Sequence, residues 1–352
     1  MNVTKRSGKW QYDFRYNNKR YRKGSFKTKK DATIAGNSKY NELINGYNIS
    51  DDNSFISYYY EWVRVNKENK VSQTTLNRYL ASGRAFEEKF GNTPINKISQ
   101  LKYREFLNEY AEGKYLTPRK EGRAKGSVKK LHNCLSGAFA DAINEKLITK
   151  DPTYKAEPHG VKKEKSEKDK FMNLTDYKKL KSYVSDSYEL SYLFIYVLIA
   201  TGARFKEIQH LKYSDIDQVK QQIHLPGTKS ENAERTIAIA KNDLKHILNI
   251  LDNRPRNMGG YIFNTGATLI SNNAVTKTLR KFLLENKIGN YTLHALRHTH
   301  ASMLLSEGLS IQYVSKRLGH ANIEITWRVY SHLLEEQKLE EDSMLDSALA
   351  NF

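Results

Sequence analysis

The stretch LGHANIEITWRVYSH, residues 318–332, contains side chains whose spacing could support chemistry. Tyr330 follows His320 by ten residues, and Thr326 lies one helical turn before it. The hydroxyl of Tyr330 could be a nucleophile held beside a histidine that handles its proton. The alternative is an ordinary half-buried aromatic residue, since the chain has 23 tyrosines. Other parts of the sequence must decide between these two interpretations.

An arginine and a lysine in the middle of the chain are further candidates. In ATGARFKEIQHL, residues 200–211, an apolar helix breaks at Thr201-Gly202 and a new helix begins with Arg204. Glu207 lies three residues later on the same helical face, where it could orient that guanidinium, although such pairs are also common on protein surfaces. Lys229 lies in the turn of a predicted hairpin, where most lysines are solvated.

A histidine-rich segment, LHALRHTHAS, residues 293–302, contains the last candidates. Helical spacing puts His294 and Arg297 on one face. The i, i+4 pair His294 and His298 could instead suggest zinc. That motif needs a glutamate directly after the first histidine, and Ala295 stands there. We therefore expect no metal site.

The elements that must position these residues can be read from the hydrophobic pattern. Residues 9–16, KWQYDFRY, alternate apolar and polar side chains, which predicts a strand with one packed face. Asn17-Asn18 predicts a turn, a second basic strand follows over residues 19–26, and a helix is expected over about 30–43. Residues 55–151 show helical spacing throughout, and Cys134 falls on an apolar face as a core residue.

The remainder is predicted to be mainly helical with one hairpin. The charged stretch 155–170 has few large apolar residues and predicts a linker. Residues 221–240 contain two short β-like runs around a polar turn. The run LSYLFIYVLIA, residues 190–200, is too short to span a bilayer. A signal peptide is not expected either, because residues 1–11 lack an apolar region.

The charge distribution favours a polyanionic partner. Lysine and arginine outnumber aspartate and glutamate by 58 to 39, which gives a net charge of +19. Residues 1–50 hold 12 basic and 3 acidic residues, so almost half of the excess lies in this short segment. Concentrated positive charge indicates nucleic acid binding. With one cysteine, no disulfide can form within the chain, and a reducing compartment is expected.

Taken together, the candidates occur in an order that resembles the tyrosine recombinase (phage integrase) family. The matching blocks are TGARFKEIQHLKYSDID, GTKSENAERTIAI, LHALRHTHASMLLSEGLSIQYVSKRLGH and ITWRVYSH. The resemblance implies a mainly α fold with small β elements: an N-terminal three-stranded sheet plus helix, a helical core-binding (SAM-like) domain and an α+β catalytic domain. The expected boundaries are 1–47 for an arm-type DNA-binding domain, 54–154 for the core-binding domain and 165–352 for the catalytic domain.

The resemblance also implies a site-specific recombinase, or integrase, that integrates and excises a mobile element of a phage, conjugative transposon or genomic island. Tyr330 would attack a DNA phosphodiester to form a 3′-phosphotyrosyl bond. Arg204 and Arg297 would bind the phosphate, and His320 would hydrogen-bond it. The remaining expected roles are general base or acid for His294, acid for Lys229 and support of Arg204 for Glu207, with no cofactor. His298 and His332 are expected to be structural.

The resemblance implies double-stranded attachment sites as partners, bound at core and arm sites by a homotetramer. It also implies the cytoplasm of a bacterial host cell, with association to its nucleoid, as the location. An excisionase and a host DNA-bending protein are further possible partners, and no membrane partner is expected. The residues expected to bind arm DNA are Lys9, Gln11, Arg15, Lys19, Arg20, Arg22 and Lys23.

Two other functions stay open. A type IB topoisomerase would share the nucleophile, but it needs no basic N-terminal domain. A non-cutting DNA-binding regulator would be expected to lack some of the six polar residues. The tail, residues 335–352, could dock on a neighbouring subunit or fold back on its own domain.

Overall fold

The computed structural model describes residues 1–47, 54–163, 171–227, 234–327 and 330. The chain forms two compact units, Met1–Glu164 and Lys165–Phe352, here called the N-terminal and C-terminal units. Lys229, His332 and the tail 335–352 lie outside the described residues.

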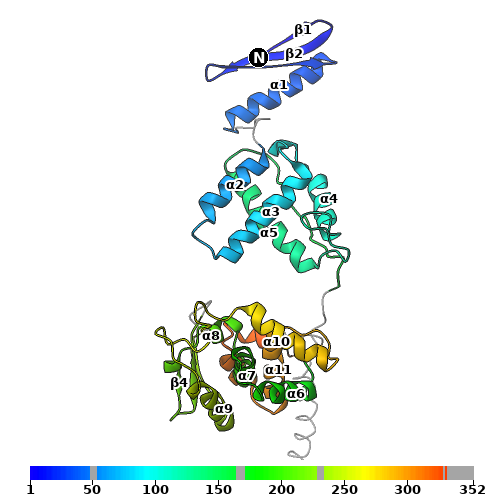
Figure 1. Ribbon diagram of the computed structural model, residues 1–352. Coiled ribbons are helices and arrows are strands. Elements are labelled where there is room, and N and C mark those ends of the chain that lie inside the picture. The colour runs from blue at the N-terminus through cyan, green and yellow to red at the C-terminus, as the bar shows by residue number, and fades with distance from the viewer. Residues whose placement is uncertain (48–53, 164–170, 228–233, 328–329, 331–352) are drawn as a thin grey trace, which may run out of the picture. The chain divides into compact units, whose positions relative to one another are not determined.

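The N-terminal unit begins with an antiparallel sheet of order β1-β2-β3, followed by a helix (Figure 1). The bounds are β1 Asn2–Arg6, β2 Lys9–Tyr16, β3 Lys19–Phe26 and α1 Lys29–Ile44. Asn17 and Asn18 both adopt positive φ, as a two-residue hairpin turn requires. Tyr12 and Phe14 of β2 are buried, and α1 covers this face of the sheet. The expected three-stranded sheet and helix are confirmed.

Four further α-helices form most of the remaining described part of the N-terminal unit. They are α2 Phe55–Asn66, α3 Gln73–Phe90, α4 Gln100–Ala111 and α5 Lys125–Asn144. Phe55 of α2 stacks on Phe139 of α5 with ring centroids 3.8 Å apart, and Phe86 of α3 packs against both rings. Cys134 is buried beside this core, as predicted.

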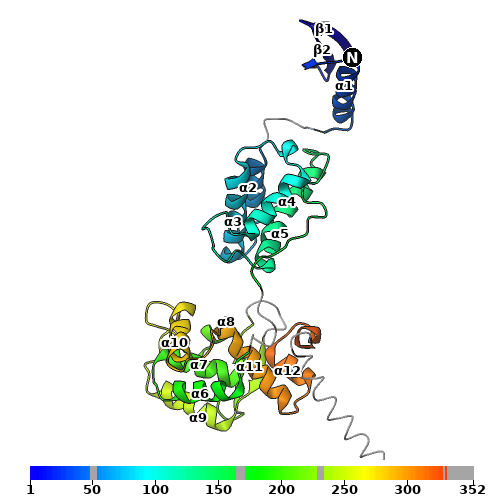
Figure 2. The same ribbon diagram turned by 90° about the vertical axis from the view of Figure 1, so that its right-hand side faces the viewer.

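Most of the described helices in the C-terminal unit pack against one apolar helix, α7 (Figure 2). Its helices are α6 Leu174–Ser185, α7 Leu190–Thr201, α8 Phe205–Gln209, α9 Lys241–Asp252, α10 Asn272–Glu285, α11 Leu293–Ser306 and α12 Ile311–Leu318. A second antiparallel sheet has β4 Ile216–Asp217, β5 Gln222–Leu225 and β6 Arg235–Ala238 in that order. The strands β5 and β6 confirm the predicted hairpin, and the mainly α fold with two small sheets confirms the expected fold class.

The turn at the end of α7 positions Arg204, the first of the candidate site residues. Gly202 adopts a left-handed conformation with φ +65°, which glycine tolerates without a steric penalty. Thr201 supports the turn, because its hydroxyl donates to the Val197 carbonyl and accepts the Ala203 amide N–H. A Cβ on Gly202 would lie 2.5 Å from Cδ2 of the buried His300 ring. The turn therefore needs both the conformation and the small volume of glycine.

We expect Gly202→Ala to lower the unfolding free energy of the C-terminal unit by roughly 2–5 kcal/mol, from left-handed strain plus overpacking. Gly308→Ala is the matched control, because Gly308 has φ +81° and a Cβ there would meet open space, with no neighbouring atom within 4 Å. Gly308→Ala should lower the unfolding free energy only by the backbone strain, about 1–2 kcal/mol. Hydrogen exchange of α7 peptides as a function of urea measures both values. Equal losses in the two variants would contradict the packing argument.

Candidate active site

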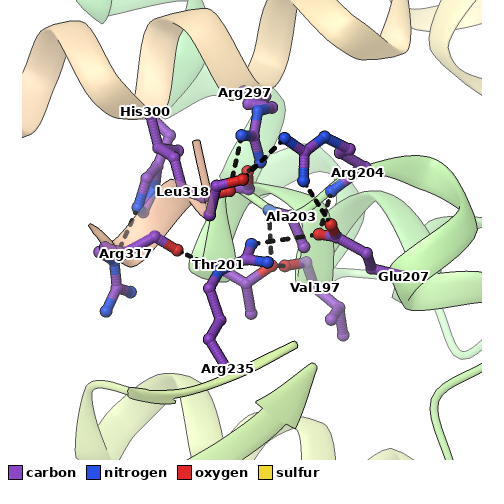
Figure 3. A network of polar contacts seen from close by, with 12 residues as sticks. Val197, Thr201, Ala203, Arg204, Glu207, Arg235, Arg297, His300, Arg317 and Leu318 are labelled. Atoms are coloured by element: carbon purple, nitrogen blue, oxygen red, sulfur yellow. Dashed lines mark hydrogen bonds and ion pairs between the residues drawn. The ribbon is translucent and has the colours of Figure 1, made fainter. Parts of the chain in front are cut away.

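A polar network connects the end of α7 to α8, α11, α12 and β6 (Figure 3). Arg204 precedes α8 as its N-cap residue. Its Nη1 donates to Glu207 Oε1 at 2.7 Å, and its backbone N–H donates to Glu207 Oε2 at 2.8 Å. The predicted pair therefore forms, and it lies inside the protein, since Glu207 has no exposed surface.

The charge of Glu207 is maintained by its arginine partners. Burial alone would raise the pKa of this carboxyl group, since it penalises the charged form. Hydrogen bonds and charge from Arg235, together with the bonds from Arg204, outweigh burial and lower the pKa below its usual value. Glu207 is therefore an anion at neutral pH, bound by two guanidinium groups.

Arg297, in α11, lies beside Arg204 (Figure 3). Its Nη1 donates to the Gly202 carbonyl at 2.9 Å, and its Nη2 donates to the Leu318 carbonyl at 2.6 Å. Burial, followed by the neighbouring charge of Arg204, lowers the pKa of Arg297 to about 9. The side chain is 3% exposed and still carries its proton at neutral pH.

Three consecutive carbonyl groups at the end of α12 each accept a hydrogen bond from a different arginine. The Arg317 carbonyl accepts from Arg235 Nε at 2.5 Å, and the Gly319 carbonyl accepts from Arg204 Nη2 at 2.9 Å. The third is the Leu318 carbonyl, which binds Arg297. The carbonyl end of a helix bears partial negative charge, so it suits cations. This helix end holds the guanidinium groups in place.

His320 follows this helix end directly. Its Nδ1 lies 2.7 Å from the hydroxyl of the buried Thr326. Burial, then the charges of Arg297 and Arg204, lower the pKa of His320 to about 3. The imidazole is therefore neutral at physiological pH. Thr326, noted in the sequence for its place before Tyr330, bonds to His320.

Tyr330 is a buried residue, with 1% of its surface exposed. It packs with Leu305, Val314 and Leu318 in a small apolar cluster. Its hydroxyl lies 3.0 Å from His298 Nδ1.

The histidine nearest Tyr330 differs from the one expected. His294 is exposed on α11, and its ring meets the His298 ring edge-on with centroids 4.8 Å apart. His298, expected to be structural, therefore lies between His294 and Tyr330. In the sequence, the position of His298 one helical turn after His294 was the feature that could have indicated its place in the site.

Three further residues of the network were missed by sequence reasoning. Arg317 donates to carbonyls of Ala238 and Ala200 and to His300 Nε2, while His300 Nδ1 donates to the Ile199 carbonyl. Burial, then the charge of Arg317, lowers the pKa of His300 to about 3. Arg235 is the third. Each lies within a helical or strand pattern that looks ordinary, which explains the omission.

The sheet of the N-terminal unit divides the residues expected to bind arm DNA. Strand register and alternation place Lys9, Gln11, Arg15, Arg20 and Arg22 on the face opposite α1. On that face Arg22 donates to Gln11, and Arg20 forms an ion pair with Asp13.

Lys19 and Lys23 pair with Tyr16 and Tyr12, so they share the face that α1 covers, although both side chains are exposed. A sheet face rich in arginine is one that can enter the major groove of DNA.

Among the described residues, no helix is long and apolar enough to cross a membrane. Within the same residues, no group of three or more histidine, cysteine, aspartate or glutamate side chains could hold a metal ion.

We expect His300→Gln to change how the stability of the C-terminal unit depends on pH. The folded pKa of His300 is about 3, below the unfolded value near 6.5, so His300 favours folding above pH 6.5 and loses this contribution as the pH falls toward 3. Glutamine does not titrate, but it can donate to Ile199 and accept from Arg317.

Between pH 7 and pH 5, the wild type should therefore lose about 2 kcal/mol more unfolding free energy than the variant. Hydrogen exchange of α11 peptides with urea at the two pH values measures this. Parallel losses would show that His300 is protonated in the folded state.

Models of known protein families match two separate parts of the chain. Residues 167–337 match the family model described as Phage integrase family, and residues 54–111 match the one described as Phage integrase, N-terminal SAM-like domain. A tyrosine recombinase XerC-like protein of Caldanaerobacter subterraneus is 26% identical, over 89% of this chain and 88% of the relative. The ICEBs1 integrase of Bacillus subtilis is 24% identical, over 74% of both chains.

Solved structures share the fold. The Tn1549 transposon integrase in complex with a circular intermediate DNA superposes with TM-score 0.66 at 18% identity, covering 79% of this chain and 95% of the other. A lambda integrase dimer bound to a COC′ core site gives 0.62 at 19% identity, covering 93% and 94%. With two family models matched along its length, the chain belongs to the phage integrase family of tyrosine recombinases.

Proposed function

We propose that this protein is a site-specific DNA recombinase that cuts and rejoins attachment sites through a 3′-phosphotyrosyl intermediate, integrating and excising a mobile element. The observation that carries the proposal is the convergence of Arg204, Arg297 and His320 on the end of α12. Tyr330 packs with Leu318, whose carbonyl binds Arg297, so the proposed nucleophile lies in the same region.

In the proposed reaction, the Tyr330 oxygen attacks the scissile phosphorus. A P–O bond to tyrosine forms as the P–O5′ bond breaks, so the number of phosphodiester bonds is conserved and no ATP is needed. Negative charge grows on the non-bridging oxygens, where two guanidinium groups stabilise it. Attack by a 5′-hydroxyl of the partner duplex reverses the step.

Proton transfer is assigned to the neighbouring basic groups. A phenol has a pKa near ~10, so Tyr330 must lose its proton as it attacks. His298 Nδ1 lies within hydrogen-bonding distance of the Tyr330 hydroxyl, and His294 beside it can pass the proton to solvent. Lys229, proposed from the sequence, supplies the proton that the leaving 5′-oxygen takes up. The Thr326 hydroxyl, donating to His320 Nδ1, leaves Nε2–H for the phosphate.

Tyr330 is 1% exposed, so its hydroxyl must become accessible before a DNA phosphate can reach it. We propose that DNA binding releases Tyr330 from the cluster around Leu305 and Val314.

Double-stranded DNA and further copies of this chain are the proposed partners. The Tn1549 and lambda relatives were solved with DNA, and a lambda integrase tetramer was solved on a Holliday junction. We propose that core sites are bound by residues 54–154 and 165–352, and arm sites by residues 1–47, with four subunits acting together. An excisionase and a DNA-bending protein remain additional proposals.

We expect Tyr330→Phe to abolish covalent attachment while preserving DNA binding, because the variant loses one oxygen atom. The substrate is a duplex with the junction sequence of the element that encodes the chain, nicked near the cleavage site so that the cut strand escapes. Wild type should form a detergent-resistant adduct, as should the control Tyr188→Phe at an exposed tyrosine. An adduct with Tyr330→Phe would identify another nucleophile. A regulator would form no adduct even as wild type.

A second prediction concerns the open face of the N-terminal sheet. Replacing Arg15 and Arg22 with glutamine should weaken binding to arm DNA and reduce the salt dependence of log K by about 2, because each phosphate contact contributes about 0.9. Lys30→Gln, on α1, is the control and should leave both quantities unchanged. Binding titrations at several salt concentrations measure the slope. The same loss in the control would mean that overall charge, and not this face, binds the arm site.

A further inference from the structure

Arg235 is a buried arginine outside the set of residues expected from the sequence. It is the first residue of β6, and its side chain is 8% exposed. Burying a guanidinium group costs free energy unless it is paired and hydrogen-bonded. The contacts of Arg235 therefore indicate what its charge does in the folded protein.

The first contact joins Arg235 to the support of Arg204. Arg235 Nη2 donates to Glu207 Oε2 at 3.1 Å, while Glu207 Oε1 accepts from Arg204 Nη1 at 2.7 Å. One fully buried carboxylate thus connects two guanidinium groups (Figure 3). Because Oε2 also accepts the Arg204 backbone N–H, both arginines bind this one oxygen of Glu207. A change at Arg235 must alter the position of the carboxylate that orients Arg204.

The second contact joins Arg235 to the segment that leads to His320. Arg235 Nε donates to the Arg317 carbonyl at 2.5 Å. Gly319 also packs against the guanidinium, since a Cβ there would lie 2.7 Å from Arg235 Nη1. In the opposite direction, Arg317 Nη1 donates to the Ala238 carbonyl of β6 at 2.8 Å. Strand β6 and the end of α12 are therefore bound together by an arginine from each side.

We propose that Arg235 is a positioning residue for strand cleavage, which holds the Glu207 carboxylate and the end of α12 so that Arg204 and His320 meet the phosphate together. The proposal rests on the proposed recombinase function and adds to it a residue that need not touch DNA. The charge of Arg235 also lowers the pKa of His320 and Arg297, after larger effects of burial and of neighbouring arginines. Arg235 thus helps to keep His320 neutral.

The test is single-turnover cleavage of the nicked duplex by Arg235→Lys in the full chain. Lysine keeps the charge but has one nitrogen in place of a planar fork, so it cannot reach Glu207 and the Arg317 carbonyl together. We expect DNA affinity to stay within about twofold and the cleavage rate to fall about 10–100-fold, since a displacement of about 1 Å in a site can cost that much. Arg254→Lys, at an arginine on the surface of the same unit that bonds to the Tyr188 carbonyl, should cleave as wild type.

A double-mutant cycle separates positioning from a general loss of stability. If Arg235 acts through Glu207, the double variant with Arg235→Lys and Glu207→Gln should cleave at nearly the rate of the slower single variant. The two rates should differ by no more than about twofold. Effects of the two changes that multiply would show independent roles and overturn the proposal. Rates are normalised to the folded fraction from thermal unfolding, so a rate that falls only in proportion to that fraction also overturns it.

The wild type distinguishes this inference from the proposed function. If wild type forms no covalent adduct with the nicked duplex, then the proposed function fails. If wild type cleaves and Arg235→Lys cleaves equally fast, the function stands and the positioning role is wrong.

Discussion

A single carboxylate, that of Glu207, holds two guanidinium groups in the interior of the C-terminal unit. Removing a charged group from water is costly, and partial pairing would leave much of that cost uncompensated. Here Arg204 and Arg235 bind both oxygens, and the remaining donors of these arginines reach the carbonyl end of α12. The positions of β6, α8 and α12 are therefore interdependent, because each provides a group that the others need to stay buried.

The sequence predicted the parts of the site that depend on residue type and order. The family resemblance depends on residues such as Arg204, Arg297 and Tyr330, which occur in recognisable blocks. The pairing of Glu207 with Arg204 was instead predicted from their spacing of three residues along a helix. The apolar alternation of β2 and the hairpin of β5 and β6 were likewise visible in local patterns, because burial of one face imposes a period of two on a strand.

What could not be predicted depends on contacts between distant segments. Strand β1 has Val3 as its one large apolar side chain, so its sequence shows no alternation, and pairing with β2 is what makes it a strand. Arg235 and Arg317 look like ordinary surface cations until β6 and α12 are brought together. The place of His298 beside Tyr330 depends on where the chain after Thr326 packs, which helical spacing within α11 does not determine.

The three carbonyl groups at the end of α12 have a consequence for the energetics of joining DNA. Without DNA, these groups already satisfy part of the hydrogen-bonding capacity of Arg204 and Arg297. In the proposed reaction, a phosphate competes with these carbonyls for the two arginines, so its net gain on binding is smaller than free guanidinium groups would give. Tight binding of a ground state slows the chemical step that follows it. For a reaction whose forward and reverse steps conserve the same number of bonds, moderate ground-state binding lets the joined product leave as readily as the uncut substrate arrives.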